Sequence, residues 1–441
     1  MRSENGQVWV WNWLPGHDGP VLAGLFELGV EPGGRRLGRF RYAQTYLDHP
    51  GRLPIDPVLL PLRPAEFKTT DLEGIFGVLR DAGPDAWGKF LIDRLHGPQD
   101  ELGYLLHAHG GRTGSIDFSA SRDIPPAPPR MLTSFQNLAI AALAVRVIIS
   151  AKGAGEPIPD DLREVLDAGT SNGGARPKFT VALEGRTWIA KFPAKDDHAA
   201  LPPMPLQECA ALTLAQRCGI RVPEHRLVDV KGVPVLLVER FDRVGAQRLS
   251  YASARTVLWS NPEVQRWSYM GSYNNFSRQM GPWIRTPDED RHELYRRVVF
   301  NALTGNQDDH DQNHGLVFDP EIASYRLAPM FDPVDSTVRP VRSLAMAFGD
   351  DAGTISIDNL LSNPESFGMD KGACDAALRF IAVQIAGHWR AELRQLGAAE
   401  PQIDAMAYRF AIAESFVRAN VTSAHRDDIS AEELATGPGA P

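Results

Sequence analysis

The segment GNQDDHDQNHGLVF, residues 305–318, constrains the fold of this chain more than any other stretch. It follows an apolar helical pattern at 295–303 and leads into two strand-like runs at 315–318 and 325–329, after which Asp332 stands in PMFDPVDS. Carboxylates crowded between buried elements repel one another unless a cation or a proton relieves them. The segment is therefore either a solvated turn or a chemical site.

Two kinds of metal site can be compared with this segment. A calcium loop of the EF-hand kind is suggested by the alternating acids that begin at Asp309. It fails because His314 stands at the sixth position, where glycine is required, and Pro320 at the twelfth, where glutamate is required. A transition-metal hydrolase stays open, although no HExxH-like helix pattern supports it. Its possible ligands are Asp308, Asp309, His310 and His314.

A third hypothesis for the segment is phosphoryl transfer. Protein kinases place a catalytic aspartate and a metal-binding asparagine as D-x-x-x-x-N in one loop, and a second metal-binding aspartate after a short hairpin. Asp308 and Asn313 have this spacing, and Asp332 follows the predicted strand pair. This hypothesis predicts a glycine-rich turn and a strand lysine upstream, where both would contact phosphates.

The upstream residues agree with this hypothesis. Gly173 and Gly174 allow the backbone to approach an anion closely, although the segment matches neither a P-loop nor GxGxxG. Lys191 lies on a predicted strand, where an ammonium without an anionic partner would be costly. Glu208, on the next predicted helix, could supply the ion pair that kinases set between a strand lysine and a helix glutamate. Each feature is common alone, but their order favours a kinase.

The hydrophobic pattern changes along the chain from strand-like to helical. Residues 7–13 and 21–28 read as strands, and 178–192 as two strands joined at Glu184-Gly185. Helices are expected at the following ranges: 71–95 with a break at Gly83-Pro84, 134–150, 205–218, 289–304, 371–398 and 401–420. The proline-rich stretch 124–130 is the best candidate linker. We predict a β-rich first part, a small α/β block and a largely helical last third.

The chain has 441 residues, enough for two or three domains. A formal net charge of -9 excludes a broadly basic nucleic-acid coat. Its three cysteines form no CxxC pair and are too few for a disulfide framework, which favours a reduced, cytoplasmic protein. We see no signal-peptide pattern at the start and no apolar run long enough to span a membrane.

Five motifs resemble those of the HipA family of bacterial serine/threonine kinases, the toxin halves of HipBA-type toxin–antitoxin modules: TSNGGARPK, WIAKFP, VERFDR, GNQDDHDQNHG and APMFD. The N-terminal stretches GPVLAGLFE, GRFRYAQTYL and GPDAWGKFLIDR are similar to the same family. The resemblance implies an α+β, two-lobed, protein-kinase-like fold with an extra β-rich N-terminal subdomain and a largely helical C-terminal lobe. The domains expected are 1–130, 131–244 with phosphate loop, lysine and hinge, 245–428 with the catalytic loop, and a flexible tail at 429–441.

The resemblance also implies roles for individual residues. Asp308 matches the catalytic aspartate, and Asn313 and Asp332 match the Mg²⁺ ligands. The matching ATP-binding positions are Lys191 and Glu208, the loop residues Gly173, Gly174, Ala175, Arg176, Pro177 and Lys178, the hinge residues Val238, Glu239, Phe241 and Asp242, and His310, which we expect to orient the loop. Ser171 matches the serine that family members autophosphorylate, although the adjacent Thr170 could take its place. Asp309 stands where other members carry glycine, and we expect it to point to solvent.

The resemblance implies ATP and Mg²⁺ as cofactors and a protein substrate, plausibly an aminoacyl-tRNA synthetase, whose phosphorylation would arrest translation and growth. It implies a HipB-like helix-turn-helix antitoxin as partner, DNA contact only through that antitoxin, and no membrane. Two alternatives stay open: a catalytically silent partner of an antitoxin, and the hydrolase considered above.

Overall fold

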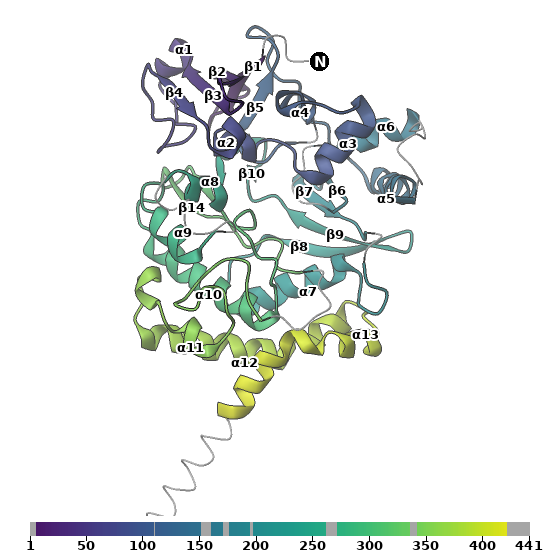
Figure 1. The fold of residues 1–441 in the computed structure, drawn as a ribbon. Coiled ribbons are helices and arrows are strands. Elements are labelled where there is room, and N and C mark those ends of the chain that lie inside the picture. The colour runs from purple at the N-terminus through teal and green to yellow at the C-terminus, as the bar shows by residue number, and fades with distance from the viewer. Residues whose placement is uncertain are drawn as a thin grey trace, which may run out of the picture.

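The computed structural model describes residues 6–109, 111–150, 160–170, 176–194, 197–261, 271–335 and 342–420. The chain begins with an antiparallel five-stranded sheet of order β4-β3-β2-β1-β5. Its strands are β1 (Gln7–Trp13), β2 (Pro20–Val30), β3 (Arg36–Tyr42), β4 (Glu66–Thr69) and β5 (Ile116–Ser119). Val8 and Val10 alternate into the core at 0% exposure, as the strand pattern predicted. The sheet lies at the top of the molecule in Figure 1.

Four helices accompany this sheet: α1 (Gln44–Leu47), α2 (Gly77–Asp81), α3 (Ala86–His96) and α4 (Glu101–His107). The predicted break at Gly83-Pro84 separates α2 from α3, because proline lacks the amide proton that a continuing helix needs. The stretch 124–130 contains no helix or strand, as the linker prediction expected.

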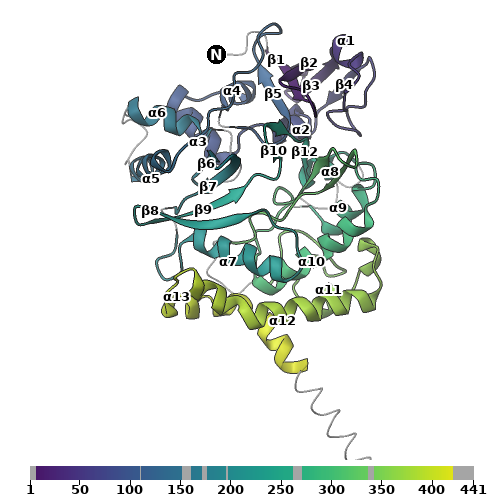
Figure 2. The ribbon, with the colours of Figure 1, turned by 180° about the vertical axis from the view of Figure 1, so that it is seen from behind.

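A second antiparallel sheet, of order β6-β7-β9-β8, separates two groups of helices. Its strands are β6 (Lys178–Leu183), β7 (Arg186–Lys191), β8 (His225–Val230) and β9 (Val233–Glu239). Val235 and Leu237 pack with α3, α5 (Phe135–Ser150) and α6 (Asp160–Asp167), while Leu236 packs with α7 (Met204–Arg217). Figures 1 and 2 show α5 and α6 above this sheet and α7 below it.

The remaining part is largely helical. Its elements are β10 (Arg243–Val244), β11 (Gln247–Arg248), β12 (Tyr251–Ser253), α8 (Ala254–Trp259), α9 (Tyr273–Gln279), α10 (Asp288–Thr304), β13 (Gly315–Asp319), β14 (Ser324–Leu327), α11 (Ile357–Leu360), α12 (Lys371–Gln395) and α13 (Glu400–Ala405). The predicted strand pair forms β13 and β14, with β12 added at its edge. Helix α10, which precedes the polar segment, is largely buried.

One apolar core runs from the N-terminal sheet into the helical part, and it includes Phe26, Phe40, Leu79, Val257 and Phe300. Helix α3 instead joins the core of the second sheet through Leu91. The domain boundaries predicted above therefore lie between regions that share apolar packing. No helix in the described ranges has the length and apolar character needed to cross a membrane.

Candidate active site

Lys191, the last residue of β7, lies between two carboxylates. Its Nζ lies 2.5 Å from Oε1 of Glu208 on α7 and also contacts Oδ1 of Asp332. The sequence predicted the first of these ion pairs; the second joins residues 141 positions apart. The side chain of Lys191 is 14% exposed, so both partners compensate a charge that is largely removed from water.

The two carboxylates respond differently to this arrangement. Burial would lower the pKa of Lys191, but Asp332 and Glu208 raise it, so the ammonium stays charged. Burial would raise the pKa of Asp332, but Lys191 and then Lys178 hold it below its usual range. Burial raises the pKa of Glu208 despite the opposing effect of Lys191. The surroundings therefore favour the charged form of Asp332 more strongly than that of Glu208.

The catalytic loop predicted at Asp308 follows the end of α10. Asp308 is exposed, and its carbonyl oxygen accepts a hydrogen bond from Nδ2 of Asn313 at 3.3 Å. The carbonyl oxygen and Nδ1 of His310 accept hydrogen bonds from the backbone amides of Asn313 and Gln312, at 2.9 and 3.3 Å, within the same loop. These bonds hold the loop in one turn, while a role of the His310 side chain in orienting the loop stays a prediction.

The prediction that Asp309 points to solvent is wrong. Asp309 is 2% exposed, and its Oδ2 accepts hydrogen bonds from Tyr273, from Asn301 at 2.6 Å and from His314 at 2.7 Å. A buried carboxylate must find donors, and the three lie on α9, on α10 and at the end of the loop. Tyr273 and Asn301 lie outside the sequence motifs described above, so no local pattern predicted them as partners of Asp309.

Asp311 anchors the same loop to α8. It is 2% exposed, and Nη2 and Nε of Arg255 donate to its Oδ1 at 2.7 and 3.0 Å. The backbone amide of Arg255 donates to the carbonyl oxygen of Asp311 at 2.9 Å, and that of Ala254 to His314 at 2.8 Å. Sequence reasoning did not identify Arg255. Asp309 and Asp311, the two acidic residues that follow Asp308 in the loop, are thus bound inward, while Asp308 itself reaches the surface.

Asp332 has a left-handed backbone conformation, with φ of 51°, which is rare for a residue with a side chain. The preceding Phe331 stacks on Phe241, with ring centroids 5.6 Å apart. Met330 is held by its backbone amide, which donates to the carbonyl oxygen of Arg221 at 2.8 Å. The two residues that precede Asp332 are thus held in place, next to a strained residue that contacts Lys191.

The predicted hinge residues lie at the end of β9. Val238 pairs with Ile189 in the sheet, and Glu239 lies 3.2 Å from Nη1 of Arg186. Asp242 is 2% exposed, and Arg240, Arg243 and the backbone amide of Gly114 all donate to its carboxylate. Its side chain is therefore committed to protein contacts, and a part in adenine binding stays a prediction for the hinge backbone and Phe241.

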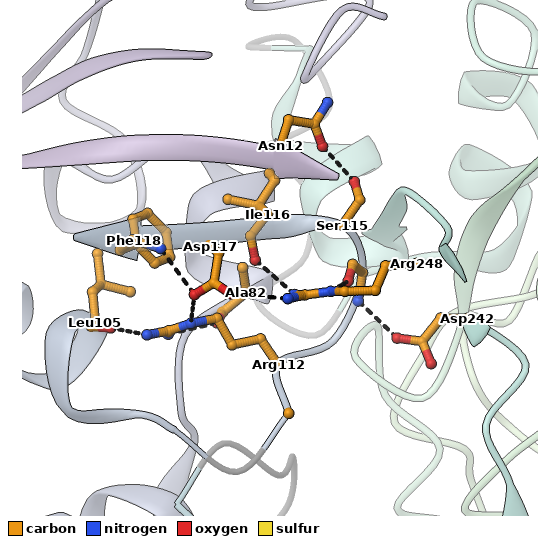
Figure 3. A network of polar contacts seen from close by, with 12 residues as sticks. Asn12, Ala82, Leu105, Arg112, Ser115, Ile116, Asp117, Phe118, Asp242 and Arg248 are labelled. Carbon is orange, nitrogen blue, oxygen red and sulfur yellow. Dashed lines mark hydrogen bonds and ion pairs between the residues drawn. The ribbon is translucent and has the colours of Figure 1, made fainter. Parts of the chain in front are cut away.

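Strand β11, shortly after the hinge, is joined to the N-terminal sheet through Arg248. Nη1 and Nη2 of Arg248 donate to Asp117 and to the carbonyl oxygen of Ile116, both at 2.9 Å, and Nε of Arg112 donates to Asp117 at 2.7 Å. Figure 3 shows Asp117 between these two guanidinium groups. Strand β11 and the N-terminal sheet are thus connected through buried ion pairs.

The described ranges exclude part of the predicted phosphate loop: Ser171, Gly173, Gly174 and Ala175 lie outside them. Thr170 is buried at 0% exposure; its hydroxyl donates to the carbonyl oxygen of Asp167 at 2.7 Å and accepts from the amide of His109 at 2.9 Å. Arg176 is ion-paired with Asp197. Lys178 lies directly opposite Lys191 across β6 and β7.

The donor set at Asp332 and Asn313 suits Mg²⁺. Magnesium prefers hard oxygen ligands and is usually bound through one or two carboxylates together with water and phosphate oxygens. Asn313 donates through Nδ2 to Asp308, which makes Oδ1 its ligand atom. Within the described ranges no group of three or more His, Cys, Asp or Glu side chains could hold a metal ion. Asp309 and His314, two of the four ligands considered for a hydrolase, are buried and bonded to each other.

Comparisons with known proteins agree with these observations. The family model described as HipA-like C-terminal domain matches residues 170–389. The protein named "Putative kinase Y4dM" of Sinorhizobium fredii is 31% identical over 168 residues, which are 35% of this chain and 39% of the relative. "Putative kinase Y4mE" of the same organism is 23% identical over 331 residues, covering 70% of this chain and 74% of the relative.

Among solved structures, HipA of Shewanella oneidensis MR-1, determined with HipB and its operator DNA, matches with a TM-score of 0.65 and 17% identity. The match covers 92% of this chain and 96% of that chain. It confirms the predicted fold class, a mixed α and β architecture similar to that of HipA. With its HipA-like C-terminal domain at residues 170–389, the chain belongs to the HipA family.

Proposed function

We propose that this protein is an ATP-dependent serine/threonine protein kinase. The observation that carries the proposal is the contact of Lys191 with both Glu208 and Asp332, beside a loop that presents Asp308 and Asn313. A lysine on a strand, a glutamate on a helix and an aspartate after a hairpin are the parts with which kinases position phosphates. In this proposal Lys191 and Lys178 hold the phosphates of ATP, and Asp332 and Asn313 hold Mg²⁺.

The transfer step follows from this assignment. The hydroxyl oxygen of the substrate bonds to the γ-phosphorus, the bond between that phosphorus and the bridging oxygen of ADP breaks, and the hydroxyl proton passes to Asp308. Burial, together with the nearby carboxylates of Asp335, Asp309 and Asp332, raises the pKa of Asp308, which makes it a better proton acceptor than an ordinary aspartate. When bound, Mg²⁺ supplies neutralisation of the phosphate charge.

Ser171 is the residue we propose for autophosphorylation. The competing candidate Thr170 is buried, and its hydroxyl is already engaged as a donor to Asp167 and as an acceptor from His109. Phosphorylation of Thr170 would therefore break two hydrogen bonds in an interior that excludes water. A phosphate on Ser171 would repel nucleotide, since it adds negative charge beside the predicted phosphate loop.

The proposal also includes binding partners, which we infer from the family. HipA of Shewanella oneidensis was determined with HipB and its operator DNA, which supports a HipB-like antitoxin as partner and DNA contact through that partner. The proposed substrate is a protein, plausibly an aminoacyl-tRNA synthetase, whose phosphorylation would arrest translation and growth. A reduced cytoplasmic location, predicted from three cysteines, would suit such a partner and substrate; all three are free and buried.

Intact-mass spectrometry after incubation with Mg·ATP, followed by peptide mapping, tests the activity. We expect the wild type to gain phosphate in peptide 170–178, on Ser171, while Asp308→Asn gains none. Lys191→Ala should lose ATP binding, whereas Asp308→Asn should keep it. If phosphatase-treated wild type binds ATP but never gains mass, an active autokinase is excluded. If it binds neither ATP nor Mg·ATP, the silent antitoxin partner becomes the better description.

A further inference from the structure

Helix α3 of the N-terminal region packs closely against Thr170. At Gly88, near the start of α3, a methyl group would overlap the carbonyl oxygen of Thr170. Alanine is the better helix former by about 1 kcal/mol, so helix propensity does not explain a glycine here. The close approach of α3 to Thr170 requires it.

The same helix also holds the start of β6. Nε1 of Trp87 donates a hydrogen bond to the carbonyl oxygen of Lys178 at 3.1 Å, and its ring meets that of Phe179 edge-on, with centroids 6.4 Å apart. Trp87 is 5% exposed. Figure 1 shows α3 above β6 and β7, and Figure 2 shows the same order from behind. Consecutive residues of α3 thus contact Thr170 and Lys178, which precede and follow positions 171–177 in the chain.

A carboxyl group immediately before α3 also lies near Lys178. Asp85 precedes the first residue of α3, and its Oδ1 is buried without a hydrogen-bond partner among the described residues. Burial raises the pKa of Asp85 to about 7, with Lys178 acting against the shift and Asp332 with it. Lys178 in turn lies opposite Lys191 in the sheet. The N-terminal region therefore places a carboxyl group near Lys178, one of the two lysines that we assign to the phosphates.

We propose that α3 is a positioning element of the nucleotide site: Gly88 and Trp87 fix the backbone of Thr170 and Lys178, and this contact sets the affinity for the phosphates of ATP. The inference rests on the proposed kinase function. In this proposal the N-terminal region contributes to the nucleotide site indirectly, by positioning Thr170 and Lys178.

Gly88→Ala tests the contact with Thr170, because the added methyl group must push α3 away. We expect KM for ATP to rise about tenfold while kcat stays within about twofold, since a small displacement of phosphate-binding residues weakens binding. A merely structural effect would reduce the fraction of active protein, which lowers the apparent kcat and leaves KM unchanged. Gly387→Ala is the matched control, because Gly387 is an exposed helix residue with no atom within 4 Å of the added methyl group.

If Gly88→Ala does not fold, Trp87→Phe tests the positioning role of α3 instead. It keeps an aromatic ring but removes the hydrogen bond to Lys178, and we expect KM for ATP to rise severalfold. Its control is Trp13→Phe, since the buried Nε1 of Trp13 makes no hydrogen bond among the described residues. An unchanged KM in folded Trp87→Phe and Gly88→Ala would overturn the proposal.

Hydrogen–deuterium exchange separates this proposal from the proposed function. If the wild type neither binds nor uses ATP, the kinase assignment fails, and the role of α3 is then decided in nucleotide-free protein. We expect the amides of residues 178–183 to exchange faster in Trp87→Phe than in the wild type and Trp13→Phe. Equal exchange in all three proteins would overturn the positioning role.

Discussion

The carboxylate of Asp309 lies inside the helical part, where Tyr273, Asn301 and His314 donate to the same oxygen atom. This arrangement ties α9, α10 and the catalytic loop together immediately beside Asp308. Buried donors that lose their acceptor remain removed from water but no longer form the hydrogen bond that compensates for the lost hydration. The side chain of Asp309 therefore bears on both stability and loop position.

We predict that Asp309→Ala lowers the free energy of unfolding by about 3 kcal/mol or more, because three buried donors lose their acceptor. The phosphoryl-transfer rate should fall as well, since the turn that presents Asp308 loses its support. Chemical denaturation measures the first effect and steady-state kinetics the second. Gln312→Ala, an exposed position in the same loop, should change neither. Equal stability of Asp309→Ala and wild type would contradict this view of the loop.

The raised pKa of Asp308 predicts a pH dependence of kcat. Partial loss of hydration raises the pKa of Asp308 most, His310 acts in the opposite direction, and Asp335, Asp309 and Asp332 raise it further. A base must be ionised, so kcat falls as pH decreases, with a midpoint above the ordinary value of about 3.9. His310→Gln removes the opposing charge and should move the midpoint to higher pH.

The measurement is kcat at saturating ATP between about pH 4.5 and 8, a range chosen to bracket a raised carboxyl pKa. His17→Gln removes an exposed histidine of the N-terminal region and should leave the midpoint in place. A lower midpoint in His310→Gln than in the wild type would exclude Asp308 as the titrating base.

At the scale of elements, α8 connects the N-terminal region to the catalytic loop. Asp81, at the end of α2, accepts hydrogen bonds of 2.7 Å from the backbone amide and the hydroxyl of Ser253 and from the hydroxyl of Thr256. These are the N-cap and first-turn residues of α8, where amides need an acceptor. Arg255 then holds Asp311. The short helix α8 thus contacts both α2 and the loop that contains Asp308.

We predict that Arg255→Lys lowers kcat about tenfold and leaves KM for ATP nearly unchanged, because lysine cannot reproduce a two-nitrogen contact and the loop loses its position. Arg379→Lys is the control: Arg379 lies 2.6 Å from Asp375 on α12, but its side chain is 51% exposed, and such pairs contribute little. Equal kcat in Arg255→Lys and the control would show that Asp311 does not position the loop.

At the scale of the whole molecule, the N-terminal region and the rest of the described chain share one apolar core. The large apolar core includes residues of both, and buried arginines join the hinge to the loop that precedes β5. Burial would raise the pKa of Asp117, but Arg112 and Arg248 hold it below its usual value. Its stabilising charge is therefore present at neutral pH and is lost only as acid protonates it.

We predict that Asp117→Asn lowers the free energy of unfolding at neutral pH by about 3–5 kcal/mol, because it leaves Arg112 and Arg248 buried without their carboxylate. Calorimetry measures the loss as a lower melting temperature. The difference from the wild type should shrink only in acid, since the pKa of Asp117 is lowered. Asp123→Asn changes an exposed residue and serves as control. Unchanged melting of Asp117→Asn would mean that the network is not stabilising.

The sequence by itself determined most of the elements and supplied the hypothesis for the chemistry of the site. Alternating and helical periodicities located β6, β7, α7, α10 and α12, because they report which face of a segment is buried. The turn between β6 and β7 was readable from Glu184-Gly185, whose φ values of 55° and 74° are those of a tight hairpin. The spacing of Asp308, Asn313 and Asp332 could be read because they lie close along the chain.

Only the tertiary structure decided which side chains meet. No local pattern distinguishes Asp309, which is buried, from Asp308, which is exposed, since that depends on Tyr273 and Asn301 arriving from other helices. Asp332 reaches Lys191 across 141 residues, and α3 reaches Thr170 from the N-terminal region. A sequence pattern indicates which residues of a segment are buried. Which residues they contact is determined only when distant segments pack together.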